Sequence, residues 1–293
     1  MCLCRRLIRL GVRPVLRFII LFGYMYLFLK LHVTGDISKY INMKYAFLTF
    51  IMIFVFIFLA LYQLYKWNKE GSAPHSHHEH DHDHAHEENT WYKKIIVYGL
   101  LSFPLITGIF LPIATLDSNI VKAKGFHFAM IDNDKDNYSN HEILRPNTSL
   151  YYGAEDYKKM ITSDLKKYSA SDHLVLNDGN YLRALETIYN YPGNFMNKTV
   201  TINGFVYHGD ALTDNQLFLF RFGIIHCIAD AGVFGMMVQF PEKVHYKNDQ
   251  WLSVQGTLST IYYQPFKQTI PYLKVTKWKE ISAPKQQYVY RQS

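Results

Sequence analysis

The hydrophobic pattern divides the chain into an apolar first third and a mixed polar remainder. Three apolar stretches approach the roughly 20 residues that a bilayer core requires. They run over about 15–33, 45–65 and 95–114. The second is the clearest, because Phe47 to Leu61 contains Thr49 as its only polar side chain. The pattern predicts three amino-terminal transmembrane helices within a membrane region over residues 1–116.

Beyond that region, helical spacing gives way to alternation. Tyr181, Leu182, Leu185 and Ile188 fall at helical spacing. We expect helices over Glu155 to Tyr168 and Asn180 to Asn190, and strands over Thr199 to Tyr207, Gln216 to Arg221, Gly223 to Ile228, Val233 to Phe240, Trp251 to Ile261 and Pro271 to Trp278.

Five or six short strands with internal glycines such as Gly204 and Gly256 suit a small curved barrel. The sequence therefore predicts a membrane-anchored α+β protein. Residues 117–195 form the linker and helical part of a soluble domain. Residues 196–293 form a barrel like the oligonucleotide/oligosaccharide-binding (OB) fold.

A His-rich loop over residues 66–94 separates the second and third apolar stretches. Its histidines alternate with carboxylates, and they are His75, His77, His78, His80, His82, His84 and His86. Imidazole and carboxylate donors together suit Zn²⁺, Ni²⁺ or Co²⁺. Because the tract has no cysteine, we expect weak, multi-site metal binding, with Zn²⁺ as the candidate ion and no firm cofactor.

Basic residues flanking the spans predict the topology. Arginines precede the first span at Arg5, Arg6, Arg9, Arg13 and Arg17, and lysines bracket the His-rich loop at Lys66, Lys69, Lys93 and Lys94. We expect a multi-pass protein of the cell membrane with a cytoplasmic amino terminus and His-rich loop. The carboxy-terminal domain is then extracytoplasmic. The first span is interpreted as a retained signal anchor, since no A-x-A-like cleavage site follows it.

Charge and polarity argue against two function classes. The formal net charge of +7 suggests nucleic-acid binding, but the amino-terminal arginines account for most of it. A self-sufficient transporter normally places ionisable residues at mid-membrane, and the predicted spans have essentially none there. We therefore expect neither a nucleic-acid partner nor a transport path within this chain.

The carboxy-terminal part has one run rich in reactive side chains, from Arg221 to Ala231. His226, Cys227 and Asp230 form a second candidate metal site, and a histidine beside a thiol also suggests nucleophile activation. Adjacent strand residues point to opposite faces, so His226 and Cys227 share an ion only where the strand bends. The alternative is that Cys227 is a small buried side chain and Asp230 caps a turn. We predict no catalytic residues and no enzyme activity.

Several segments together carry a resemblance to a known family. They are Tyr40-Ile-Asn-Met-Lys-Tyr45, the His-rich loop, Ser102-Phe-Pro-Leu-Ile-Thr-Gly-Ile-Phe-Leu-Pro-Ile-Ala-Thr-Leu-Asp117, Glu186-Thr-Ile-Tyr-Asn-Tyr-Pro-Gly193, Gly204-Phe-Val-Tyr207 and Arg221-Phe-Gly-Ile-Ile-His-Cys-Ile-Ala-Asp230. Over nearly its whole length the chain resembles the YcgQ-type family of uncharacterised bacterial membrane proteins, known as permease subunits, and is close to the Bacillus members.

The resemblance implies a carboxy-terminal domain of unknown function, a polytopic membrane permease as partner, and a link with zinc homeostasis. Many relatives carry Cys-Cys where this chain has His226-Cys227, which weakens a dithiol site here. We therefore expect an accessory subunit of a membrane permease, whose partners are the permease, the lipid bilayer and divalent metal ions. The alternative is a membrane-anchored extracytoplasmic module that binds a non-metal ligand.

Overall fold

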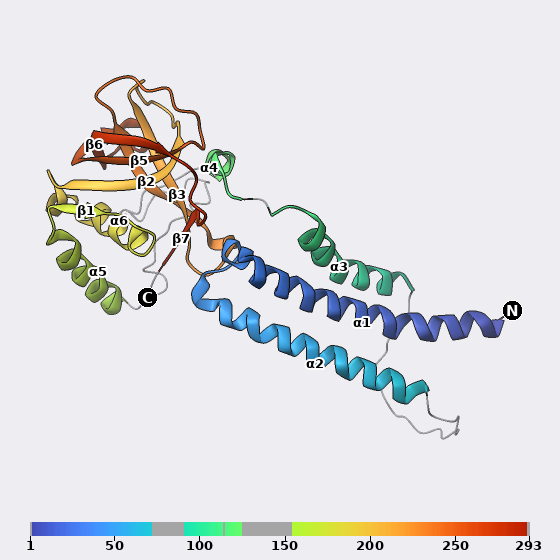
Figure 1. Ribbon diagram of the computed structural model, residues 1–293. Helices are drawn as coiled ribbons and strands as arrows, with labels where there is room; N and C mark the ends of the chain where they lie inside the picture. The colour runs from blue at the N-terminus through green and yellow to red at the C-terminus, as the bar shows by residue number, and fades with distance from the viewer. Residues whose placement is uncertain (1, 72–90, 114, 125–153, 292–293) are drawn as a thin grey trace. The chain divides into compact units, whose positions relative to one another are not determined.

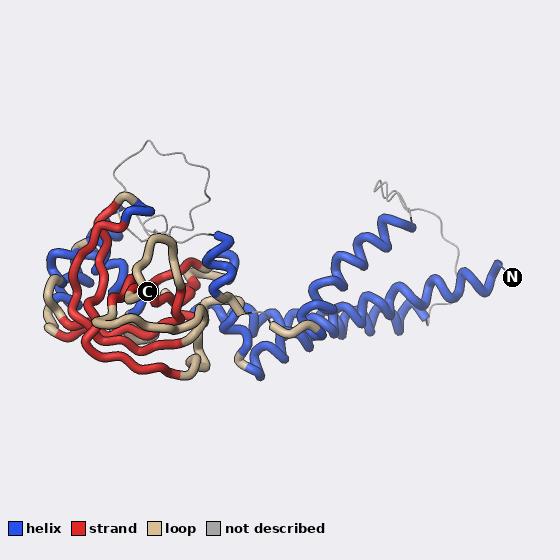
Figure 2. The backbone as a smooth tube through the Cα atoms, turned by 90° about the horizontal axis from the view of Figure 1, so that it is seen from above, coloured by secondary structure: helices blue, strands red, loops and turns tan. Residues whose placement is uncertain are grey.

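The computed structural model of the protein describes residues 2–71, 91–113, 115–124 and 154–291. The chain forms two compact units, Met1–Ala114 and Thr115–Ser293. The first unit is helical, whereas strands make up much of the second (Figures 1 and 2).

The described residues of the first unit form three long helices. They are α1 (Cys2–Thr34), α2 (Ala46–Gly71) and α3 (Trp91–Phe110), with the short 3₁₀ turns η1 (Asp36–Lys39) and η2 (Met43–Tyr45) between α1 and α2. Helix α1 contacts both α2 and α3 (Figure 1). Two helices, over Pro14–Thr34 and Met43–Lys69, are long and apolar enough to cross a membrane. The apolar part of α3, Ile95–Phe110, is shorter, so the structure bears out two of the three predicted spans by this measure.

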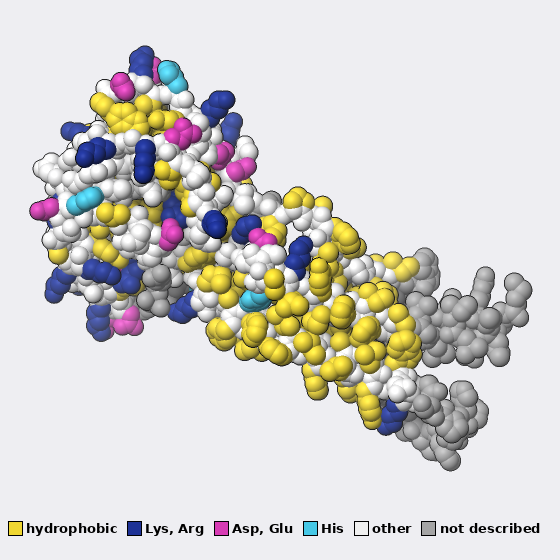
Figure 3. Space-filling model, in the orientation of Figure 1, with side chains coloured by type: hydrophobic (Ala, Val, Ile, Leu, Met, Phe, Trp, Pro, Cys, Tyr) yellow, Lys and Arg dark blue, Asp and Glu magenta, His cyan; other side chains and the backbone are white. Residues whose placement is uncertain are grey.

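The surface of these helices is unusually apolar. Phe58 of α2 is 68% exposed, and Leu100 and Phe110 of α3 are 73% and 77% exposed. On the face drawn in Figure 3, hydrophobic side chains cover the helices almost continuously. Large contiguous apolar surfaces of this kind mark contact with a membrane or with another protein.

Helices α1 and α3 pack closely through two glycines. A Cβ atom at Gly23 of α1 would lie 3.0 Å from Leu105 of α3, and one at Gly108 of α3 would lie 3.0 Å from Leu27 of α1. In each helix, a glycine therefore packs against a leucine of the other helix. Small residues at such positions allow close helix approach where no hydrophobic driving force operates.

Polar side chains of α1 also reach α3. The Tyr24 hydroxyl donates to the carbonyl of Leu101 (2.9 Å), and Lys30 Nζ donates to the carbonyl of Ile109 (3.1 Å). Pro104 lies inside α3, where proline removes a helical donor, and neighbouring side chains can satisfy carbonyl groups near such a site. The contacts advance in the same direction along both helices, so α1 and α3 are parallel.

Within its described residues, the second unit contains three α-helices and seven strands. The helices are α4 (Ser118–Lys124), α5 (Ala154–Ser169) and α6 (Tyr181–Asn190), and the strands are β1 (His173–Val175), β2 (Thr199–Tyr207), β3 (Gln216–Ile224), β4 (Gly232–Gln239), β5 (Trp251–Tyr263), β6 (Gln268–Ile281) and β7 (Tyr288–Tyr290). They form one mixed sheet in the order β1-β2-β5-β6-β4-β3-β7. Strand β2 also pairs with β3, which joins five of the strands in a closed ring of pairings.

The side chains of β3 point alternately to two buried faces of the sheet. On β3, Leu217 and Leu219 belong to a core cluster that includes the apolar face of α6. Phe218, Phe220 and Phe222 belong to a second, largely aromatic cluster on the opposite face. Side chains of a strand point alternately to either face, so burial on both sides makes β3 almost continuously hydrophobic.

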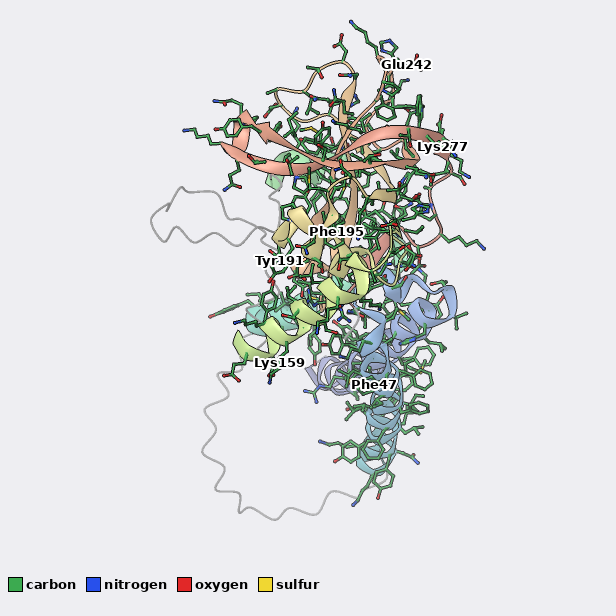
Figure 4. The ribbon with its side chains drawn as sticks, turned by 90° about the vertical axis from the view of Figure 1, so that its left-hand side faces the viewer. Phe47, Lys159, Tyr191, Phe195, Glu242 and Lys277 are labelled. Carbon is green, nitrogen blue, oxygen red and sulfur yellow. The ribbon has the colours of Figure 1, made fainter. Side chains whose placement is uncertain are left out.

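Helix α6 covers the part of the ring where β4 and β6 share few pairings. Strands β4 and β6 pair in parallel only from Met237 to Gln239. Helix α6 contacts both of them, and the Tyr189 hydroxyl donates to the carbonyl of Gly235 on β4 (2.9 Å). Near the end of α6, Phe195 lies between the helix and the sheet, whereas Lys277 lies on the outside of the sheet (Figure 4).

One predicted strand boundary is wrong. The sequence suggested a break after Arg221 and a new strand over Gly223 to Ile228, but β3 is continuous from Gln216 to Ile224 and a turn follows it. Gly223 does not interrupt the strand. A Cβ atom there would lie 2.6 Å from the ring of Phe234 and 2.7 Å from Leu182, so this glycine makes room for packing.

Candidate functional site

Of the two predicted metal sites, only one lies within the residues that the structure describes. The His-rich tract, from His75 to His86, lies outside the described residues. Within the part of the chain that the structure describes, no group of three or more His, Cys, Asp or Glu side chains is placed to hold a metal ion. The structure therefore locates only the second candidate, His226, Cys227 and Asp230.

These three residues form the turn between β3 and β4. Asp230 ends the 3₁₀ turn η5 (Ile228–Asp230), and its carboxylate faces back to the end of β3. Its oxygens accept hydrogen bonds from the backbone N–H groups of Ile225 (3.2 Å), His226 (2.9 Å) and Cys227 (3.3 Å). Nδ1 of His226 lies 3.0 Å from the same carboxylate. Asp230 therefore caps the turn.

This geometry differs from the expected strand. His226 and Cys227 lie in a turn, so the argument that adjacent side chains point to opposite faces does not apply to them. The Asp230 carboxylate is already engaged by several donors. Cys227 is a free, half-buried thiol. The hydrogen bonds of Asp230 match the turn cap of the alternative raised by the sequence, whereas Cys227 is half-buried rather than buried.

Arg221, at the start of the Arg221–Asp230 motif, links β3 to distant parts of the unit. It is 3% exposed, and it forms an ion pair with Asp178. Its guanidinium also donates to the carbonyls of Gln286 (2.8 Å) and Gln287 (3.4 Å), and lies over the rings of Tyr181 (5.4 Å) and Trp251 (5.8 Å). A planar guanidinium suits such simultaneous contacts. Arg221 therefore joins the loop before α6 to the segment before β7.

A buried ion pair anchors the last described residues. Glu186 of α6 accepts a hydrogen bond from Nη1 of Arg291 (2.8 Å), and both side chains are at most 5% exposed. The Tyr157 hydroxyl of α5 donates to the same carboxylate (2.9 Å). Burial, and then the negative charge of Glu186, raises the pKa of Tyr157 well above its ordinary value, so the phenol remains a donor.

A second, partly buried pair links α5 to α6. Arg183 donates two hydrogen bonds to the carboxylate of Asp164, from Nε (2.8 Å) and Nη2 (2.6 Å). Two parallel bonds of this kind fix direction as well as distance. The Glu186–Arg291 and Arg183–Asp164 pairs therefore have a structural explanation.

Sequence reasoning missed most of these partners. Glu186 and Arg221 lie in the motifs that indicated the family resemblance, but the sequence did not predict which residues they contact. Arg291 lies 105 residues after Glu186. Asp249, which accepts a hydrogen bond from the backbone N–H of Ser118, lies 131 residues after that serine. Each looked like an ordinary surface charge, because no local pattern marks a partner so far away.

Comparisons with known proteins agree on one family. Residues 16–127 match the model described as the DUF1980 N-terminal domain, and residues 151–291 match that of the DUF1980 C-terminal domain. The UPF0703 protein YcgQ of Bacillus subtilis (strain 168) is 48% identical over 282 residues, which are 94% of this chain and 99% of the relative. No solved structure matches the chain.

A second relative has a more specific name. A Streptococcus mutans serotype c protein, provisionally named a two-component membrane permease complex subunit, is 36% identical over 282 residues. The match again spans 94% of this chain and 99% of the relative. Both comparisons therefore extend across the helical unit and the sheet unit alike.

Proposed function

Because the chain belongs to the YcgQ-type (DUF1980) family, we propose that it is an accessory subunit of a membrane permease. One observation carries this proposal: the relative named for a permease complex aligns with both units of this chain, almost from end to end. The match is therefore to the whole architecture of helices and sheet. Neither relative's name describes a reaction, and we propose no catalytic role.

The helices support an accessory role rather than a complete carrier. Helix α1 contacts α2 and α3, and the outward faces of α2 and α3 are apolar. Two basic side chains of α1 are turned to α3: Arg17 donates to the Tyr98 hydroxyl (3.2 Å), and Lys30 donates to a backbone carbonyl. Carriers instead direct ionisable groups to a path. The partner therefore supplies the path.

We include α3 among the membrane spans. It is parallel to α1, and its glycine contacts and hydrogen bonds with α1 fall inside the apolar part of both helices. A parallel third helix requires α2 to cross in the opposite direction. In this topology the amino terminus and the His-rich loop are cytoplasmic, and the second unit is extracytoplasmic.

Cysteine-accessibility labelling tests this topology. In a background with Cys2, Cys4 and Cys227 changed to serine, His78→Cys is expected to react only from the cytoplasmic side, because the His-rich loop joins α2 to α3. Gln250→Cys is expected to react from outside. Reaction of both positions from the same side would reject the three-span arrangement.

The His-rich tract gives this subunit a role in metal handling, in our proposal. Imidazole and carboxylate donors in alternation suit divalent ions such as Zn²⁺, and many weak sites on one tether raise the local metal concentration without tight binding. The tract would then gather metal at the cytoplasmic face beside the permease.

Isolation of the complex from native membranes tests the function. The tagged chain is expected to co-purify with a polytopic membrane protein, with divalent metal in the isolated complex. Deleting residues 75–86 should retain the partner but lower the bound metal and change the metal sensitivity of the cells. A variant with the same histidines changed to asparagine keeps the length and the carboxylates, and should match the deletion.

Two results would contradict different parts of the proposal. Isolation of the chain without a polytopic partner would remove the accessory-subunit function. Unchanged metal content and metal sensitivity in both tract variants, with the partner retained, would remove only the metal-gathering role.

We infer that the second unit is a small OB-like barrel. The closed ring of pairings through β2, β3, β4, β6 and β5 supports this, because five strands with Greek-key connections are typical of that fold. It keeps open the alternative of an extracytoplasmic module for a non-metal ligand. Ligand binding by the full chain in the presence of a chelator, with no permease partner, would favour that alternative.

A further inference from the structure

Strand β6 has no strand along one of its edges over its second half. Along one edge it pairs with β5 as far as Ile281, whereas along the other it pairs with β4 only from Tyr272 to Lys274. Among the described residues, no backbone hydrogen bond joins the part from Val275 to Ile281 to a strand other than β5. This part is as long as an ordinary strand. The backbone groups along its second edge can therefore pair with one more strand.

The sequence after β4 explains why β4 leaves β6 at this point. Phe240 and Pro241 follow β4, and proline has no backbone N–H to donate to a neighbouring strand. The N–H of Phe240 donates to the carbonyl of Asn215 (2.8 Å). The N–H of Val244 donates to the carbonyl of Asp214 (3.3 Å). Both acceptors belong to the connection between β2 and β3, so the chain after β4 is hydrogen-bonded to that connection and does not continue along β6.

Three exposed lysines of β6 point to the outer face of the sheet, away from α6. They are Lys274, Lys277 and Lys279, and Figure 4 shows Lys277 on this face. Their partners on β5 are Thr257, Gln255 and Ser253, which alternate with the buried residues of that strand. Lys274 and Lys277 are three positions apart, so regular alternation would place them on opposite faces. The register shift between Gln255 and Gly256 returns them to the same face.

These lysines give the outer face beside the edge an excess of positive charge. Within the described residues, none of the three takes part in an ion pair. Glu280, the only acidic residue of β6, is opposite the core residue Leu252, so it points to the other face. Its carboxylate accepts a hydrogen bond from Gln250 (3.4 Å). A strand added at this edge would therefore meet lysines, and no carboxylate of β6, on its outer face.

The described part of the second unit exposes little apolar surface. Among its described large hydrophobic side chains, only Val175 and Tyr262 are exposed, and neither lies on β6. Peptides that bind by adding a strand to a sheet gain affinity from main-chain hydrogen bonds and do not need a large apolar patch. This mode of recognition therefore suits the surface of the second unit.

We propose that the edge of β6 from Val275 to Ile281 binds an extended acidic segment of a partner protein as an additional strand. Backbone hydrogen bonds hold the segment, and its carboxylates at alternate positions face Lys277 and Lys279 across the strand pair. The same lysines repel a second copy of this edge, because like charges opposite one another destabilise a strand pair. That the segment belongs to the permease rests on the proposed function, but the binding edge itself does not.

Peptide binding to the full chain tests the proposal, in nanodiscs of zwitterionic lipid and without a permease. The probe is a fluorescent peptide of about eight residues in which threonine and glutamate alternate. We expect it to bind and to slow hydrogen exchange over residues 275–281, because the edge amides gain acceptors. One control peptide has glutamine for each glutamate and lacks the charge. Another is N-methylated throughout and lacks every backbone N–H. Both should bind at least about tenfold more weakly than the probe.

Charge reversal on the protein makes the decisive comparison. Lys277→Glu together with Lys279→Glu should weaken binding of the acidic peptide at least about tenfold, and should allow a peptide of alternating threonine and lysine to bind instead. Lys158→Glu together with Lys159→Glu is the matched control, because both side chains are exposed on α5, where Figure 4 shows Lys159. This control changes the net charge equally and should alter the affinity less than about twofold, since salt screens distant exposed charges. Circular dichroism checks the fold of both variants.

Three results would overturn the proposal. Failure of the alternating acidic peptide to bind would mean that the lysines only keep the edge unpaired. Equal loss of binding in the two double variants would mean that net charge, and not β6, attracts the peptide. Binding without slower exchange over residues 275–281 would place the peptide elsewhere. If the β6 variant does not fold, hydrogen exchange in the unmodified chain still decides the question. Because no permease is present, failure of the accessory-subunit function would alter none of these results.

Discussion

Gly235→Ala is expected to prevent the second unit from folding, or to lower its free energy of unfolding by more than about 4 kcal/mol. Gly235 lies on β4 opposite Phe220 of β3. A Cβ atom there would lie far inside van der Waals contact with the carbonyl oxygen of Leu219, and 2.6 Å from the ring of Phe220. Backbone atoms cannot move aside as a flexible side chain can, so the strand pair itself must separate.

The effect should extend beyond the strand pair. The carbonyl of Gly235 accepts the hydrogen bond from the buried Tyr189 hydroxyl of α6. Displacing β4 therefore breaks this hydrogen bond of a buried hydroxyl, which is costly in itself. Helix α6 would lose its anchor over β4 and β6, so we expect secondary structure and tertiary packing to be lost together.

Gly193→Ala is the matched control for this prediction. Gly193 lies in the turn after α6, and a Cβ atom there would meet nothing within 4 Å. Its expected effect on stability is within about 0.5 kcal/mol. Chemical unfolding of both variants in detergent, followed by circular dichroism, measures the difference. Equal stability of the two variants would contradict the close approach of β3 and β4.

Glu186→Ala is the second large prediction, with an expected loss of about 3–5 kcal/mol in the free energy of unfolding. The substitution leaves the guanidinium of Arg291 buried without its carboxylate. It also removes the acceptor of the Tyr157 hydroxyl. A buried guanidinium that has lost its carboxylate costs far more than the ion pair contributes, because the opposite charge that offset its desolvation is gone.

A double variant separates the charge from the packing. Glu186→Leu together with Arg291→Met replaces both charges by apolar side chains of similar length, and should cost much less than either single change. Unfolding of the single and double variants forms a double-mutant cycle. Breaking the exposed Asp214–Lys243 pair with Asp214→Ala should have little effect, since solvent already screens that pair. A double variant as unstable as Glu186→Ala would contradict a dominant role for the buried charge.

The sequence predicted best where a pattern repeats locally. Strand β2 covers the residues expected from the alternation at Val200 and Ile202, and α6 begins within one residue of its expected start. The long apolar runs likewise identified α1 and α2 as helices that can cross a membrane. These elements follow from periodicity and length, which depend on neighbouring residues alone.

The same local reasoning failed where packing decides the conformation. Gly223 suggested the end of a strand, but it lies within β3 because the ring of Phe234 needs its space. Helix α4 was not expected, since its sequence is short and its stability comes from the aromatic cluster beneath it. Cys227 was placed on a strand, whereas the Asp230 carboxylate bends the chain into a turn there.

The sequence by itself determined the anchored architecture, the position of the His-rich tract and the family. Its apolar runs are long enough to specify helices without any partner, and its motifs extend along nearly the whole chain. Only the tertiary structure decided which charges meet. Glu186 finds Arg291, and Asp249 finds Ser118, across more than a hundred residues. Such pairs form only when the sheet closes and brings distant segments together. Interactions between neighbouring residues do not determine that closure.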